Sequence, residues 1–71
     1  MSDDRLVRMA NQIAAAFTAR TEAEAVAATE EHIRLYWEPR MRTALSAHLD
    51  AGGAGLTPVA RAAAVRLRGD R

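Results

Sequence analysis

Apolar residues recur every three or four positions along most of the chain, which is the spacing of one face of an α-helix. β-branched residues are scarce and never alternate with polar ones, so no segment carries a strand signal. The pattern predicts an all-α fold, a small bundle of three to four short helices at residues 3–19, 22–37, 39–50 and 58–68. We expect one domain over residues 1–71, with a frayed tail after residue 68.

Residues typical of helix ends stand at the predicted boundaries. Thr21-Glu-Ala-Glu24 has the spacing of a capping box, in which each side chain accepts a hydrogen bond from the other residue's backbone amide. Gly52-Gly53 can end the third helix, because glycine tolerates the left-handed backbone found there. Thr57-Pro58 can cap and begin the last helix.

Pro39 interrupts the helical pattern in the middle of the chain. The residue before a proline is disfavoured in helical conformation, so the second helix should end near Trp37 or Glu38 and Pro39 should begin a third. The apolar stripe nevertheless crosses the proline in phase, at positions four apart: Ile33, Trp37, Met41, Leu45 and Leu49. Two alternatives therefore stay open, two helices joined by a corner or one helix kinked at Pro39.

Size and composition favour a domain that is stabilised by a partner. The chain has 71 residues, of which 49% are hydrophobic but only 4% aromatic, and alanine supplies much of the apolar content. A domain of this size buries only about 60–65% of the surface that its unfolded chain exposes. There is no Cys, which excludes disulfides and thiolate zinc sites. Another protein is the remaining support that we expect.

The charges are nearly balanced, at a net +1 from ten basic and nine acidic residues. Every basic residue is Arg, whose planar fork suits carboxylates, phosphates and aromatic faces. Modules that bind nucleic acid usually carry a strongly basic patch, so an Arg-rich nucleic-acid binder is the less favoured alternative. No signal peptide or apolar run of 18 residues is evident, and we expect a cytoplasmic chain without a membrane partner.

No set of residues suggests catalysis or metal binding. Glu30 and Glu31 are adjacent, which on a helix directs them about 100° apart. His32 and His48 are sixteen positions apart without a carboxylate at ligand spacing, whereas zinc needs three or four ligands. The chain also lacks a Gly-rich phosphate loop and a nucleophile–base set. We therefore expect no catalytic residue, no metal ligand and no cofactor in this chain.

Residues 32–42 contain the only Trp, the only Tyr, one of two Pro and three of ten Arg. Aromatic residues, Met and Arg are the types enriched where proteins dock on one another. We therefore predict a partner interface at Arg34, Trp37, Pro39, Arg40, Met41 and Arg42. Trp37 could equally belong to the core, with one side of its ring packed inward.

Two short blocks carry a family resemblance. Val7-Arg-Met-Ala-Asn-Gln-Ile-Ala14 and the later His32-Ile-Arg34, Trp37 and Pro39-Arg-Met-Arg42, followed by the glycine loop, resemble the delta subunit of cytosolic NAD-dependent formate dehydrogenases. The resemblance spans about residues 3 to 58. It adds two residues of the first block, Asn11 and Gln12, as candidate partner contacts.

The resemblance implies a non-catalytic accessory subunit. In that family a large subunit carries molybdenum or tungsten on two pyranopterin guanine dinucleotides together with iron–sulfur clusters, and other subunits carry further clusters, FMN and the NAD site. The delta subunit would bind the large subunit and support cofactor insertion or the stability of the complex. A transient assembly chaperone that leaves the mature enzyme is the alternative.

Overall fold

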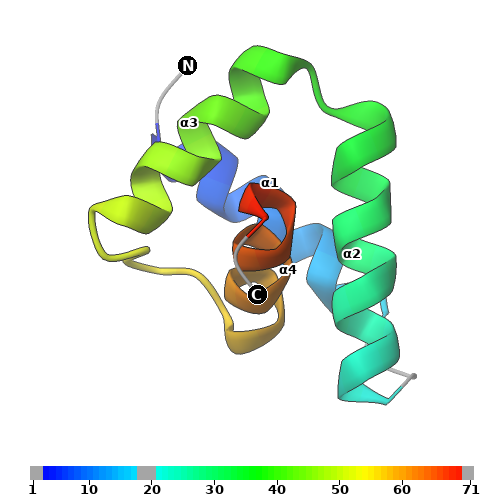
Figure 1. Cartoon of the computed structure of the whole chain (residues 1–71). Helices are drawn as coiled ribbons and strands as arrows, with labels where there is room; N and C mark the ends of the chain where they lie inside the picture. The colour runs from blue at the N-terminus through cyan, green and yellow to red at the C-terminus, as the bar shows by residue number, and fades with distance from the viewer. Residues whose placement is uncertain (1–2, 18–20, 70–71) are drawn as a thin grey trace.

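The computed structural model of the chain describes residues 3–17 and 21–69, and within them it contains four α-helices. They are α1 (Asp3–Ala15), α2 (Glu22–Tyr36), α3 (Pro39–Asp50) and α4 (Pro58–Arg68). Helix α4 lies in the angle between α2 and α3, and α1 contacts all three other helices (Figure 1). The described residues form no strand, and the predicted all-α bundle is confirmed.

Helix α1 is shorter than its apolar pattern predicts. It ends at Ala15, and the backbone N–H groups of Ala16 and Phe17 donate to the carbonyls three residues before them, at 3.1 and 3.2 Å. Such bonds tighten the last turn and satisfy carbonyls at a helix end. Residues 18–19 of the predicted helix lie outside the described residues. The other predicted boundaries agree with α2, α3 and α4 to within one residue.

The predicted capping box begins α2. The Thr21 hydroxyl accepts from the Glu24 N–H at 3.2 Å, and the Glu24 carboxylate accepts from the Thr21 N–H at 3.4 Å. At α4 the Thr57 hydroxyl accepts from the Ala60 N–H at 3.4 Å, with Pro58 as the first helical residue. Side chains thus accept hydrogen bonds from backbone amides in the first turns of α2 and α4, which have no partner within the helix.

A corner, rather than a kink, joins α2 to α3. Trp37 (φ −87°, ψ 139°) and Glu38 (φ −65°, ψ 151°) both have extended backbone, and Pro39 begins α3. Across the corner, the Arg42 guanidinium donates to the carbonyl of Arg34 at 3.1 Å. The continuous helix that the in-phase stripe also allowed is therefore wrong, because two residues in succession leave the helical conformation.

The core is built from a few large side chains and many alanines. Leu6, Ile33 and Leu45 are each at most 1% exposed. Alanines from α1 and α4 complete the same cluster: Ala10, Ala14, Ala60 and Ala64. Because these side chains are short, α4 can approach the neighbouring helices closely. The apolar stripe that crosses Pro39 faces this core, as the sequence pattern requires.

The loop at residues 51–57 is fastened to the helices by side chains. Arg61 donates to the carbonyls of Gly52 and Gly53, both at 3.0 Å. Gly53 has φ +65°, and a Cβ there would lie 2.9 Å from the Arg61 guanidinium. The positive φ favours glycine at this position, because the end of the flexible Arg61 side chain could move aside for a Cβ whereas the left-handed backbone could not.

Candidate docking surface

The structure distributes the predicted interface residues over two sides of the α2–α3 corner. One set lines an apolar groove: Gln12, Trp37 and Met41. A second set lines a basic cleft: Arg34, Pro39 and Arg42. Asn11 and Arg40 line neither, and Arg40 is exposed on α3.

The apolar groove lies between α1, α2 and the start of α3 and has a volume of about 510 Å³. Seven of its lining residues are apolar or aromatic, and the other two are Gln12 and His32. The full lining is Met9, Gln12, Ile13, Ala16, Phe17, His32, Tyr36, Trp37 and Met41. Its size is in the usual range for ligand-binding clefts, about 300–1,000 Å³.

Tyr36 is the most exposed large side chain of this groove. It is 73% exposed, and its ring lies against that of His32, with 4.8 Å between the ring centroids. Leu35, its neighbour on α2, is 64% exposed but does not line the groove. An exposed aromatic ring beside an apolar groove is typical of a docking surface.

Trp37 belongs mainly to the core of the chain. It is only 6% exposed and packs in the same cluster as Ile33 and Leu45. Its side chain also lines the apolar groove, so the little of its surface that is exposed is open to a partner there. The inward packing that the sequence left open is therefore the main role of this residue, and its contact with a partner stays a prediction.

Asn11 has an internal role that the sequence analysis did not identify. Its side-chain N–H donates to the carbonyl of Gly55 at 2.9 Å, and its side-chain oxygen accepts from the Thr57 N–H at 3.0 Å. The amide thus ties α1 to the loop before α4. The one sequence signal for this contact is the glycine-rich loop itself, whose backbone groups need partners.

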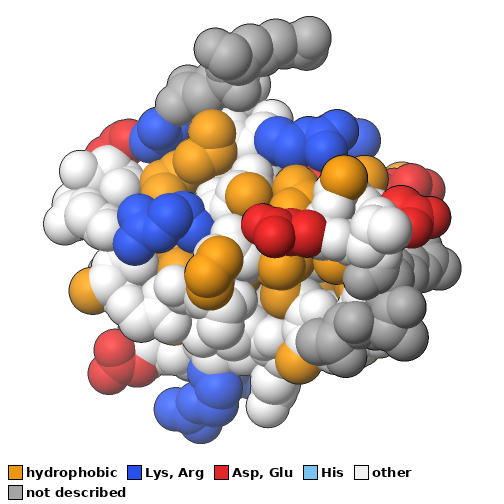
Figure 2. All heavy atoms as spheres, turned by 90° about the horizontal axis from the view of Figure 1, so that it is seen from below, with side chains coloured by type: hydrophobic (Ala, Val, Ile, Leu, Met, Phe, Trp, Pro, Cys, Tyr) orange, Lys and Arg blue, Asp and Glu red, His pale blue; other side chains and the backbone are white. Residues whose placement is uncertain are grey.

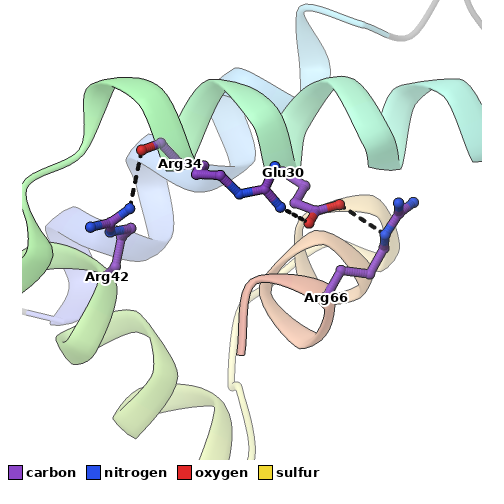
Figure 3. Close-up of polar contacts among 4 residues, drawn as sticks. All are labelled: Glu30, Arg34, Arg42 and Arg66. Atoms are coloured by element: carbon purple, nitrogen blue, oxygen red, sulfur yellow. Dashed lines mark hydrogen bonds and ion pairs between the residues drawn. The ribbon is translucent and has the colours of Figure 1, made fainter. Parts of the chain in front are cut away.

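Glu30 is a buried carboxylate that joins two helices. It is 7% exposed, and it forms ion pairs with Arg34 of the same helix and with Arg66 of α4, the second at 2.8 Å (Figure 3). Figure 3 also shows the Arg42 guanidinium directed at the Arg34 carbonyl. Glu31 is exposed, so the two adjacent glutamates do not share a site.

The basic cleft lies on the other side of the corner and has a volume of about 480 Å³. Three arginines from three helices line it, Arg34, Arg42 and Arg68, together with Thr43 and Ser46. Arg68 also pairs with Asp50. Arg68 was not predicted from the sequence, because nothing in the pattern indicates that the end of α4 lies beside the start of α3.

Two kinds of feature are absent from the described residues, a metal-ligand cluster and a membrane-spanning helix. No three His, Asp or Glu side chains of this part of the chain gather as a metal site, and none of its helices is long and apolar enough to cross a membrane. His48 is directed at the Ala54 carbonyl, at 2.8 Å. On the face drawn in Figure 2, Arg side chains lie apart, with Asp and Glu side chains among them.

Comparison with known proteins identifies the family. The family of the NADH-dependent formate dehydrogenase delta subunit, FdsD, matches residues 5–64 of the 71. No curated protein and no solved structure matches the chain. The matched segment includes the groove-lining parts of α1 and α2, the corner and most of α4. The chain therefore belongs to the delta subunit family of NADH-dependent formate dehydrogenases.

Proposed function

We propose that this chain is a non-catalytic accessory subunit that binds the large, molybdenum- or tungsten-bearing subunit of formate dehydrogenase through the apolar groove. Its family supports membership in the complex. The observation that carries the docking site is Tyr36, 73% exposed beside a groove whose lining is mostly apolar. Burying these side chains against a partner would remove their apolar surface from water, at about 25 cal/mol per Å².

The proposed effect of binding is to raise the fraction of large subunit that holds its metal cofactor. A protein that binds one state of its partner more tightly shifts the partner toward that state by the difference in affinity. We expect the partner to carry molybdenum or tungsten on two pyranopterin guanine dinucleotides and iron–sulfur clusters, with FMN in another subunit. This chain would stabilise the cofactor-competent conformation and take no part in electron transfer.

The docking site is tested by two neighbouring substitutions on α2. Tyr36→Ala removes an exposed side chain of the groove, and Leu35→Ala removes one of similar exposure outside it. If Tyr36 anchors the interface, Tyr36→Ala weakens association with the large subunit by about 2 kcal/mol, roughly thirtyfold in Kd. Leu35→Ala should change the Kd less than about fivefold.

The measurement is titration of the purified large subunit with each variant, after circular dichroism has verified the helical fold. Equal losses for the two variants would contradict docking through the groove. Trp37→Ala is a poorer test, because removing a core side chain also destabilises the chain itself. Co-elution of the chain with the complex in stoichiometric amount would distinguish a resident subunit from a transient assembly chaperone.

A further inference from the structure

The basic cleft collects positive charge that the fold itself does not fully neutralise. Arg34 shares the Glu30 carboxylate with Arg66, so one carboxylate serves two guanidinium groups. Arg42 donates to a backbone carbonyl, which carries no formal charge. Among the described residues that line the cleft there is no Asp or Glu. Arg68 pairs with Asp50, so four arginines (Arg34, Arg42, Arg66 and Arg68) meet two carboxylates on this side of the corner.

The arrangement of these arginines suits carboxylates spaced along a chain. Arg34 comes from the end of α2, Arg42 from the start of α3 and Arg68 from the end of α4, so the guanidinium groups are distributed around the cleft. A guanidinium has five N–H donors in a planar fork that matches a carboxylate, and each internal contact of Arg34 and Arg42 occupies only part of it.

The rest of the lining favours an acidic polypeptide over a nucleic acid as the ligand. Pro39 and Leu67 supply apolar surface for the carbon atoms of side chains, and Thr43 and Ser46 supply hydroxyls. The net charge of the whole chain is only +1, whereas surfaces that bind nucleic acid are strongly basic. Carboxylate side chains on a peptide are the anions that suit such a mixed lining.

We propose that the basic cleft binds an acidic segment of the same large subunit that docks in the apolar groove. The inference rests on the proposed function and adds the chemistry of the partner to it. Continuity supports a single partner, because Trp37 lines the groove while Pro39, two residues later, lines the cleft. A partner that covers the corner reaches both. Carboxylates of the partner in the cleft would also pair with Arg34 and Arg42, which lie next to the apolar groove.

The cleft is tested on the full chain with a hexaglutamate peptide as the probe. We expect the peptide to shift the Nε–Hε resonances of Arg34, Arg42 and Arg68 in NMR spectra, while hexaglutamine shifts none of them. Arg42→Gln should weaken hexaglutamate binding about tenfold. Arg8→Gln is the matched control, since it removes the same charge from an exposed site on α1 and should leave binding unchanged.

Two results would overturn the proposal. One is equal loss of hexaglutamate binding in the Arg42 and Arg8 variants, which would indicate a nonspecific charge effect. The other is tighter binding of inorganic pyrophosphate than of hexaglutamate at the same arginines, which would indicate a phosphate site. Arg68→Gln provides a second test of the cleft should Arg42→Gln disturb the corner, and circular dichroism verifies the fold of each variant.

Binding to the large subunit separates this inference from the proposed function. If Tyr36→Ala weakens that association and Arg42→Gln does not, the partner binds in the groove and the proposal of an acidic segment in the cleft is wrong. If Arg42→Gln weakens the association and Tyr36→Ala does not, the partner binds in the cleft and the proposal of docking through the groove is wrong. We expect both variants to weaken it, and the effect of Arg42→Gln to shrink at high salt because exposed charges are screened.

Discussion

Asn11 and Gln12 are neighbours in the sequence with different surroundings in the fold. The Asn11 amide makes two hydrogen bonds to the loop before α4, whereas Gln12 is exposed at the apolar groove. Asn11→Ala should lower the free energy of unfolding by about 1–2 kcal/mol, because two backbone groups lose their partner. Gln12→Ala should change it by less than about 0.5 kcal/mol. Urea unfolding followed by circular dichroism measures both, and equal effects would contradict the internal role of Asn11.

Glu30 and Glu31 form a second matched pair. Glu30→Gln keeps the shape of a buried side chain but removes the charge that pairs with Arg34 and Arg66. We expect a loss of about 1 kcal/mol in the free energy of unfolding, since both arginines are about half exposed and solvent screens the pairs. Glu31→Gln, at an exposed position of the same helix, should have almost no effect. The prediction fails if thermal unfolding gives the same midpoint for both variants.

Residue types alone could not assign these roles. The sequence contains both glutamates in one run, and only the packing of α4 on α2 buries the first and supplies Arg66. Trp37 shows the same limit, because the composition of residues 32–42 indicated a contact surface without saying which rings turn inward. The exposed ring is that of Tyr36, one residue earlier, and the helical phase that decides which ring turns inward depends on where α2 ends.

At the scale of elements, Pro39 favours the corner but tertiary contacts hold it. As the first residue of α3 it needs no N–H donor, and its fixed φ suits the helical start. Pro39→Ala should leave the four helices intact and lower the free energy of unfolding by about 0.5–1 kcal/mol, mainly because the unfolded chain gains freedom. Chemical unfolding measures this change. A large gain in helical circular dichroism would instead show that α2 and α3 fuse, and would contradict a corner held by tertiary contacts.

Helix positions were predictable because local signals and apolar period agree. The capping box begins α2, Thr57 and Pro58 begin α4, and glycines follow α3. The end of α1 was not predictable, since the apolar spacing continues beyond Ala15 while the last turn tightens. The choice between a corner and a kink at Pro39 was also open, because the apolar stripe has the same phase in both. The contact of Arg42 with the Arg34 carbonyl forms across the corner of the folded chain, so the sequence could not indicate it.

At the scale of the whole molecule, both candidate surfaces are assembled from three helices. Four of the predicted residues line these candidate surfaces, namely Trp37 and Met41 in the groove and Arg34 and Arg42 in the cleft, and their contact with a partner stays a prediction. The partners of those residues, from α1 in the groove and from α4 in the cleft, come from segments far away in the sequence. Periodicity cannot distinguish an apolar position that faces a helix from one that faces an open groove.

We propose that this chain acts by binding the large subunit and thereby raises the cofactor occupancy of that subunit. The most direct measurement is molybdenum or tungsten per large subunit, with activity per bound metal, in strains that express the wild-type chain, Tyr36→Ala, Leu35→Ala or no delta chain. We predict that deletion and Tyr36→Ala lower metal content and total activity in parallel, while activity per bound metal and the Leu35→Ala strain stay near wild type. Full metal loading with slow turnover in the deletion strain would contradict the claim and indicate a direct effect on the working enzyme.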